Sequence, residues 1–133
     1  MFTKILEFDL DAEEFKDITE EIENFVGETG VESGLLLIFS LGSTSALITI
    51  ENEEGLLEDF RKLLERFAPK NEKYLHNRID NNAVSHLKAS LLGQSLVLPV
   101  KDGKPQLGTW QQVFLLNLDF RPRKRKVILQ LIA

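Results

Sequence analysis

The chain contains only two histidines, and they are the first side chains to consider for chemistry. His76 and His86 are ten residues apart, with Asp80 between them. This is not the i, i+4 spacing that puts two imidazoles on one helical face. A loop and a helix can still bring both rings to one divalent cation, with Glu51 or Asp80 as an oxygen ligand. The alternative is that both are surface or hydrogen-bonded side chains.

Acidic residues follow one of the predicted strands. Glu51, Glu53 and Glu54 come directly after an apolar segment. A carboxylate at a strand end serves as a general base when its pKa is raised, or it holds a cation. Spacing alone favours a solvated acidic turn that leads into the next helix.

A second group of candidate residues surrounds the single tryptophan. Trp110 is followed by Gln111 and Gln112. An indole beside amide side chains can stack on a heterocycle and hydrogen-bond its edge. The alternative is that Trp110 belongs to the core, which is the more frequent role of a lone tryptophan.

Five bases occur in the six residues 121–126, directly before the last predicted strand. Such a run binds phosphate, RNA or an acidic partner, or it forms a solvated hairpin loop. No aromatic residue interrupts it, so stacking on a single strand is not supported and nucleic-acid binding is not expected. The chain also lacks the glycine-rich nucleotide loops and the G-x-S-x-G elbow.

Charge and composition narrow the class of protein. The net charge is -5, but residues 1–68 hold 17 acids and 5 bases, whereas residues 69–133 hold 4 acids and 11 bases. A phosphate-bearing ligand is therefore expected to bind the second half. The chain has no cysteine, which excludes disulfides, thiolate zinc sites and a cysteine nucleophile.

The remaining composition is that of an ordinary globular domain. With 133 residues, 43% hydrophobic and 28% charged, we expect one domain over the whole chain. The first residues carry no secretory signal, which predicts a cytoplasmic location. The longest apolar run, residues 35–39, is far shorter than the roughly 20 residues of a spanning helix, so no membrane partner is expected.

The elements that must position these residues follow from hydrophobic patterning. Thr19 is expected to cap one helix, a long apolar stripe predicts a second that ends before Pro69, and a third is expected over 83–92 after an extended loop. The runs 35–39 and 46–50 are interpreted as buried strands, the first because it is apolar on both faces. Further strands are predicted over 2–10, 95–100, 113–118 and 127–132, with a hairpin turn at 102–103. Mixed elements followed by antiparallel strands indicate an α+β fold, largely antiparallel, with two to three helices.

Residues 85–100 read SHLKASLLGQSLVLPV, and Gly103 and GTWQQ over 108–112 follow them. This long block closely resembles the YjbQ-like family, also called the secondary thiamine-phosphate synthase family. The resemblance extends over nearly the whole chain and includes Tyr74 with His76, and Arg125 before the last strand.

The resemblance implies a small α+β subunit that forms a homotrimer with sites near the subunit boundaries. The apolar last strand, which needs cover, agrees with an oligomer. The implied reaction joins a pyrimidine-methyl diphosphate to a thiazole phosphate with a divalent cation (Mg, Mn or Zn). The implied site combines metal-binding, catalytic and substrate-binding residues, listed here in that order: His76 and His86; Glu51 and Asp80; Ser43, Thr44, Asn82, Trp110, Gln111 and Arg125.

Three positions depart from the family pattern. Gly42-Ser43-Thr44 stands where the family usually has His-Thr-Thr or His-Thr-Ser, Ile50 replaces an asparagine, and Asn117 replaces an acid. Loss of one imidazole from a three-histidine site weakens or abolishes metal binding. The alternative function is therefore a non-catalytic homotrimer that binds a ligand or anion at a degenerate metal site.

Overall fold

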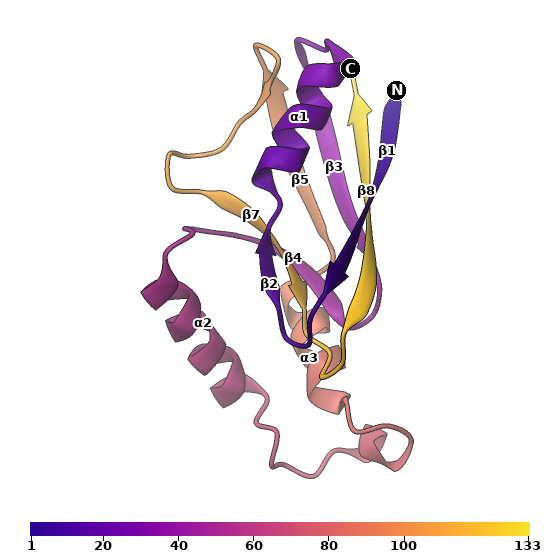
Figure 1. The fold of residues 1–133 in the computed structure, drawn as a ribbon, viewed down its shortest axis with the longest axis vertical. Coiled ribbons are helices and arrows are strands. Elements are labelled where there is room, and N and C mark those ends of the chain that lie inside the picture. The colour runs from indigo at the N-terminus through magenta and orange to yellow at the C-terminus, as the bar shows by residue number, and fades with distance from the viewer.

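The computed structural model describes residues 1–133 as an α+β fold of three helices, one 3-10 turn and eight strands (Figure 1). The helices are α1 (Thr19–Thr29), α2 (Glu54–Phe67) and α3 (Ala83–Leu92), and the 3-10 turn η1 covers Leu75–Arg78. The strands are β1 (Phe2–Leu10), β2 (Phe15–Asp17), β3 (Ser33–Leu41), β4 (Ser45–Ile50), β5 (Ser95–Lys101), β6 (Lys104–Pro105), β7 (Gln112–Asn117) and β8 (Arg123–Ile132).

The strands form two antiparallel sheets. The larger, which we call sheet A, has the order β1-β8-β3-β5-β6, and the smaller, sheet B, has the order β2-β7-β4. The main core lies between the inner face of sheet A, one face of sheet B, and α1. A second cluster covers the opposite face of sheet B and contains Leu64 of α2 and Ala89 of α3. Sheet B is therefore buried on both faces, and it links the two clusters.

Sheet A, in contrast, has one face without cover. Side chains alternate across a strand, so Leu36 and Ile38 face the core while Leu35 and Phe39 face outward. The prediction that residues 35–39 are buried on both faces is therefore wrong for the outer face. Val97 on β5 and Ile132 on β8 add to this exposed apolar surface, and they are 60% and 52% exposed.

The last strand lies inside the sheet and not at its edge. β8 pairs with β1 on one side and β3 on the other. The apolar strand at the C-terminal end of the chain thus needs no edge partner, and what remains uncovered is its outer face. Close approach to β3 requires Gly34, because a Cβ there would overlap the carbonyl oxygen of Ile132.

Helix α1 is tied to sheet B at its first turn. The Oγ1 of Thr19 donates to Asp17 Oδ1 (2.6 Å) and accepts from the backbone N–H of Val113 (2.8 Å). Thr19 is thus the first helical residue and not the cap, which is Ile18. The helix ends at Gly30, which adopts the left-handed conformation that favours glycine.

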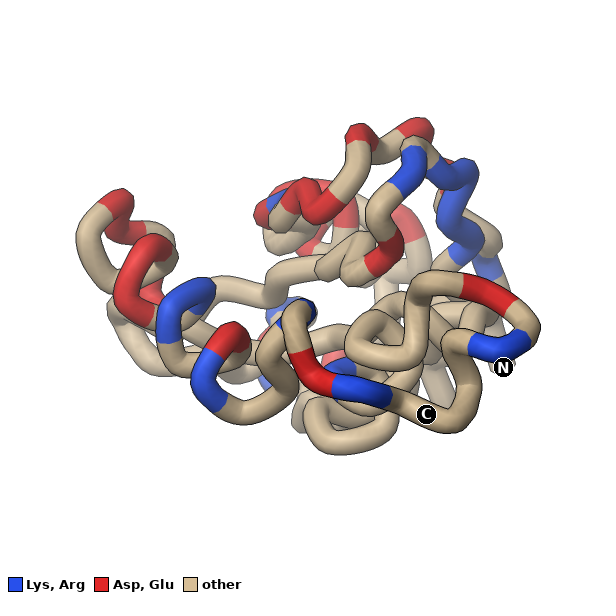
Figure 2. The backbone as a smooth tube through the Cα atoms, turned by 90° about the horizontal axis from the view of Figure 1, so that it is seen from below, with Lys and Arg blue, Asp and Glu red and all other residues tan.

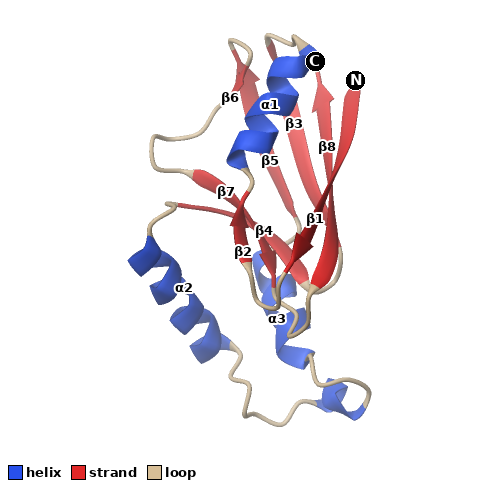
Figure 3. Ribbon diagram, viewed as in Figure 1, coloured by secondary structure: helices blue, strands red, loops and turns tan.

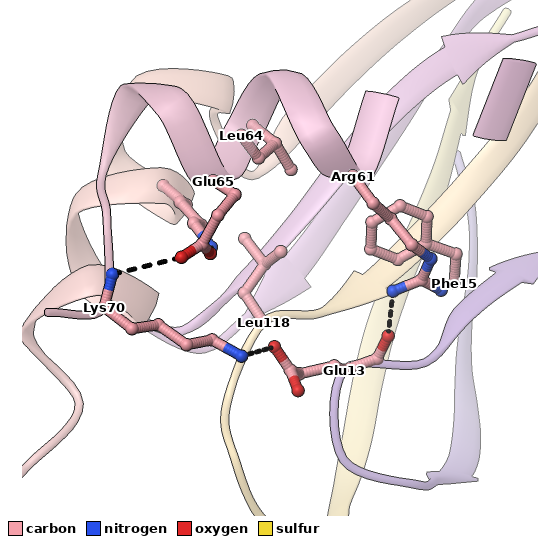
Figure 4. A pocket seen from close by; sticks show the side chains of 8 residues that line it. Glu13, Phe15, Arg61, Leu64, Glu65, Lys70 and Leu118 are labelled. Atoms are coloured by element: carbon pink, nitrogen blue, oxygen red, sulfur yellow. Dashed lines mark hydrogen bonds and ion pairs between the residues drawn. The ribbon is translucent and has the colours of Figure 1, made fainter. Parts of the chain in front are cut away.

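Helix α2 lies at the periphery and is joined to the body by loops at both ends (Figure 3). Polar contacts hold it there, as Figure 4 shows. Arg61 covers the ring of Phe15 at 3.7 Å and donates to the carbonyl of Glu13, and Lys70 pairs with the Glu13 carboxylate at 2.9 Å. These contacts border a cavity of about 250 Å³. Lys88 of α3 lines the same cavity, and burial lowers the pKa of its amine although Glu65, 3.8 Å away, favours its charged form.

Two predicted boundaries differ from the structure. The basic run 121–126 is not a hairpin loop, because β8 begins at Arg123. Two of its bases reach Glu7 on β1, Lys124 at 3.8 Å and Lys126 at 3.9 Å. The segment 70–82 is not wholly extended, since it contains η1. Strand β2 was not predicted.

Basic and acidic segments are interspersed along the folded chain, as Figure 2 shows. The acidic first half and the basic second half meet in ion pairs, for example where β1 lies beside β8. No helix combines the length and the hydropathy that crossing a membrane requires.

Candidate functional site

The structure brings the two imidazoles together. The ring centroids of His76 and His86 are 4.8 Å apart, and the rings meet edge to face at 72°. His76 comes from η1 and His86 from the first half of α3, so a turn and a helix supply one side chain each. The rings thus lie together, as a shared ion would require, and binding of an ion stays a prediction.

Asparagines fix the loop that carries His76. Nε2 of His76 lies 3.1 Å from Oδ1 of Asn82, a buried residue at the start of α3. The side chain of Asn77 accepts a hydrogen bond from the Ala83 N–H, which belongs to the first turn of α3. Asn82 therefore orients an imidazole and does not cap the helix with its side chain. Both histidines line an open cavity of about 570 Å³.

A buried arginine lies at the other side of α3. Arg125 on β8 is only 6% exposed. Its Nη2 donates to the carbonyl and the hydroxyl of Thr44 (3.1 and 2.7 Å) and to Oδ1 of Asn117 (2.6 Å). Its Nε is buried and has no hydrogen-bond partner. The guanidinium is thus held by neutral oxygens alone, although a carboxylate is the stronger partner for such a group.

The nearest carboxylate is already engaged. Asp119 is 1% exposed and binds Arg123 through Nε and Nη2, both at 2.9 Å. Burial raises the pKa of this carboxyl, but the Phe120 N–H and the bonds from Arg123 outweigh burial and hold the pKa below its usual range. Burial likewise lowers the pKa of Arg125, and the charge of Asp119 opposes this only in part.

Gly42 lies against the guanidinium of Arg125. A Cβ at this position would come within 2.9 Å of Nη1 of Arg125 and 3.0 Å of Oγ of Ser45, and the glycine has φ +156°. Gly42, Ser43 and His86 line a further cavity of about 360 Å³. His86 therefore borders two cavities, one shared with His76 and one shared with Gly42.

Two side chains of the Gly42 cavity were not predicted as site residues. Ser90 and Gln94 line it together with His86. Ser90 follows His86 by four residues on α3, so it lies on the same face of the helix. This spacing was available in the sequence and would have identified Ser90 once His86 was chosen.

The remaining predicted residues lie at the far end of sheet B. Gln111 donates to Thr49 Oγ1 at 3.3 Å, and Glu51 follows the end of β4. Gly42 precedes the start of β4 and Glu51 follows its end. The six residues of the strand, roughly 20 Å at about 3.3 Å per residue, therefore separate Glu51 and Gln111 from the cavity beside Gly42. Trp110 is 72% exposed, so it is not part of the core.

The acids do not complete a metal site within one chain. Nowhere in the structure do three or more His, Asp or Glu side chains gather to hold an ion. Asp80 instead pairs with Arg121 at 3.2 Å. One chain thus brings together His76, His86 and Asn82 on one side, and Ser43, Thr44 and Arg125 nearby. Asp80 is beside His76 along the backbone, but its carboxylate pairs with Arg121. Glu51, Trp110 and Gln111 lie apart from these residues.

Comparison with protein families gives a match over almost the entire chain. Residues 4–133 match the model of a family described as UPF0047 protein YjbQ-like. A UPF0047 protein of Archaeoglobus fulgidus is 44% identical over 117 residues, which are 88% of this chain and 90% of that protein. One from Methanothermobacter thermautotrophicus is 46% identical over 114 residues, 86% and 79% of the two chains.

Solved structures agree with the fold. A crystal structure described as a YbjQ-like protein of unknown function from Sulfolobus solfataricus is 36% identical, with a TM-score of 0.85 over 99% of this chain and 100% of that one. An uncharacterised YjbQ/UPF0047 protein from Clostridium acetobutylicum is 31% identical, with the same TM-score, covering 96% and 99%. These matches extend to the whole architecture, both sheets included.

Proposed function

The chain belongs to the YjbQ-like UPF0047 family, and from that premise we propose that it binds a small phosphorylated molecule and joins a pyrimidine-methyl diphosphate to a thiazole phosphate. The thiazole nitrogen would attack the methylene carbon, and the carbon–oxygen bond to the diphosphate would break, giving thiamine phosphate and diphosphate. The observation that carries the proposal is the contact between His76 and His86, with ring centroids 4.8 Å apart.

The two imidazoles supply part of a divalent cation site. Zinc and manganese accept imidazole nitrogen, but a resident ion usually has three protein ligands or more. One chain offers two rings, and the carboxylate of neighbouring Asp80 pairs with Arg121. We therefore propose that a cation binds only together with the ligand, whose phosphate oxygens complete its coordination. When bound, it supplies positive charge to the departing diphosphate.

The protein's own side chains have roles that do not require the ion. Asn82 holds the ring of His76 in one orientation through the 3.1 Å contact with Nε2. Arg125 and the Thr44 hydroxyl supply positive charge and a polar group beside the cavity that His86 and Ser43 line. Fixed dipoles and charges of this kind stabilise a leaving diphosphate without reorganisation during the reaction.

A homotrimer is part of the proposal, and two observations support it. The outer face of sheet A exposes a cross-strand row in which Ile5 and Phe39 both lie opposite Ile128. Exposed apolar surface of this extent is typical of an interface between chains. In addition, Trp110 and Gln111 lie too far from the histidines of their own chain to hold one ligand with them. A neighbouring copy can provide these two side chains.

Assembly is tested by light scattering after size-exclusion chromatography. The wild type is expected to have the mass of three chains. Val97→Asp puts a charge on the exposed face of sheet A, and this variant is expected to have the mass of one chain. Lys104→Asp on β6 is the matched control and should leave the trimer intact. A wild-type mass of one chain would refute the homotrimer.

Activity is tested with purified protein and both thiamine precursors, with and without manganese. Thiamine phosphate should form above a no-protein control, and His86→Ala should abolish it, while Asn81→Ala, an exposed neighbour, should not. Absence of product under all conditions would favour the second candidate, a non-catalytic trimer that binds an anion. Gly42, in place of the family's histidine, is the observation in favour of that candidate.

A further inference from the structure

We propose that the cavity beside Gly42 binds the phosphate group of the ligand, and that the buried guanidinium of Arg125 balances the phosphate charge from behind the glycine. The inference rests on the proposed function, because it gives a place to one part of the proposed ligand. It concerns two positions at which this chain departs from the family pattern, Gly42 and Asn117. Asn117 accepts a hydrogen bond from Arg125, and Gly42 lies against its guanidinium.

The first argument is the buried charge of Arg125, which Asp119 compensates only in part. Arg125 is 6% exposed, and the hydrogen bonds of Nη2 go to neutral oxygens of Thr44 and Asn117. Burying a cation without a counter-charge is costly, and the carboxylate of Asp119 is already bonded to Arg123. An anion close to Arg125 therefore gains more energy than one at an exposed lysine, whose charge is screened by water.

The second argument is the opening that glycine leaves. No side chain separates the backbone at position 42 from Nη1 of Arg125, since a Cβ there would lie 2.9 Å from this nitrogen. The same glycine forms part of the wall of the 360 Å³ cavity. An anion above Gly42 and Ser43 thus comes close to the guanidinium without displacing any protein group.

The third argument is the lining of the cavity. It contains hydroxyls of Ser43 and Ser90, the amide of Gln94 and the imidazole of His86, and no Asp or Glu. The cavity under α2 is different, because its lysines already face the carboxylates of Glu13 and Glu65. A phosphate would meet repulsion there, whereas beside Gly42 it meets hydroxyl and imidazole donors. The side-chain nitrogen of Gln94 already donates to the carbonyls of Ser45 and Ala89 and shapes the wall instead.

The experiment titrates inorganic phosphate into the metal-free protein at constant ionic strength and follows backbone amide shifts by NMR. The wild type should show saturable shifts at Gly42 and Ser43. Asn117→Asp keeps nearly the same side-chain size but puts a carboxylate where Oδ1 accepts from Arg125 at 2.6 Å. Because this carboxylate would balance the charge of Arg125, the variant should bind phosphate at least tenfold more weakly. A charge-assisted hydrogen bond contributes enough for about that factor. Lys124→Gln, an exposed change on the same strand, should bind as the wild type does.

Several results would overturn the inference. Shifts that never saturate, or that do not include Gly42 and Ser43, would indicate that phosphate binds elsewhere. Wild-type affinity in folded Asn117→Asp would remove the role of the partly compensated charge. If that variant does not fold, Gly42→Ala decides, because its Cβ would press on Nη1 of Arg125 and Oγ of Ser45 and displace the guanidinium. Wild-type phosphate affinity in Gly42→Ala would equally refute the proposal.

The outcome is independent of the proposed reaction. Saturable phosphate binding without formation of thiamine phosphate would support the anion site and refute the transfer reaction. Formation of thiamine phosphate by the wild type, together with unchanged phosphate binding in Asn117→Asp, would support the transfer reaction and refute the anion site.

Discussion

Replacing Asn117 by alanine is expected to be among the most destabilising single changes at the site. The side chain is fully buried and makes four hydrogen bonds. Its Nδ2 donates to the carbonyls of Asp11 (2.9 Å) and Arg121 (3.1 Å). Its Oδ1 accepts from Nη2 of Arg125 (2.6 Å) and from the N–H of Asp119 (3.2 Å). Alanine leaves all four partner groups without this contact.

The magnitude follows from the burial of these partners. An unsatisfied buried polar group costs about 1–3 kcal/mol, and more when it is charged. The two carbonyls belong to partly buried loops, where water restores part of the loss, whereas the Asp119 N–H and the Arg125 guanidinium are buried. We expect the free energy of unfolding to fall by about 3–5 kcal/mol, a large share of the 5–15 kcal/mol of a typical domain.

Urea unfolding followed by circular dichroism measures this change. All variants are compared at one protein concentration, because association between chains would shift the unfolding equilibrium by mass action. Asn52→Ala is the matched control. That asparagine is exposed and makes a single 3.0 Å bond to Asp17, so the change should stay within about 0.5 kcal/mol. A loss of less than about 1 kcal/mol in Asn117→Ala, with an unchanged dependence on urea, would refute the view that this network stabilises the fold.

Two further predictions concern pH and close packing. Hydrogen bonds from Phe120 and Arg123 depress the folded-state pKa of Asp119, so its contribution to stability is present above the unfolded pKa of about 4 and is lost as the pH falls through the folded value. In that pH range the urea midpoint of the wild type should drop more than that of Asp119→Asn. Equal drops in the two proteins would contradict the assignment. Gly34→Ala should lower the free energy of unfolding by about 1–3 kcal/mol, measured by thermal unfolding, because its Cβ meets the backbone of the neighbouring strand. Gly27→Ala is the control: this helical position has open space around it, so the variant should gain about 0.5–1 kcal/mol. A neutral Gly34→Ala would show that the strands can separate there.

Most elements could be predicted because their sequence signals are local. The stripe from Leu56 to Phe67 has helical periodicity, and it forms α2. The helix expected over 83–92 forms with Gly93 at its end. Such signals depend on neighbouring residues and on capping, and they do not require the fold to be known.

Other elements depend on pairing, which the sequence does not show. The basic residues Arg123 to Lys126 have the composition of a loop, but they extend β8 because β1 pairs with all four of them, and β3 also pairs with Lys126. Strand β2 has three residues and exists only through its pairing with β7. The apolar outer face of β3 was predicted to be core, because an apolar run is the usual pattern of a strand buried on both faces, whereas Leu35 and Phe39 are exposed here.

For the candidate site, the sequence identified the residue types but not their grouping. His76 and His86 meet because η1 turns directly before α3, a short-range arrangement. Glu51 was grouped with them as a possible oxygen ligand and Trp110 through the family resemblance, and the length of sheet B separates both from the histidines within one chain. The role of Asn82 at His76 depends on a side-chain rotamer, which spacing does not predict.

The position of β8 has a consequence for biosynthesis. β1 and β3 both pair with β8 and not with each other, so the center of sheet A stays without its central ladder until the final strand has left the ribosome. Residues at the start of the chain must wait for partners more than a hundred positions away, as the pairing of Phe2 with Leu131 illustrates. We therefore expect the sheet to form slowly and only once β8 is available, since contacts between distant residues must close long loops first.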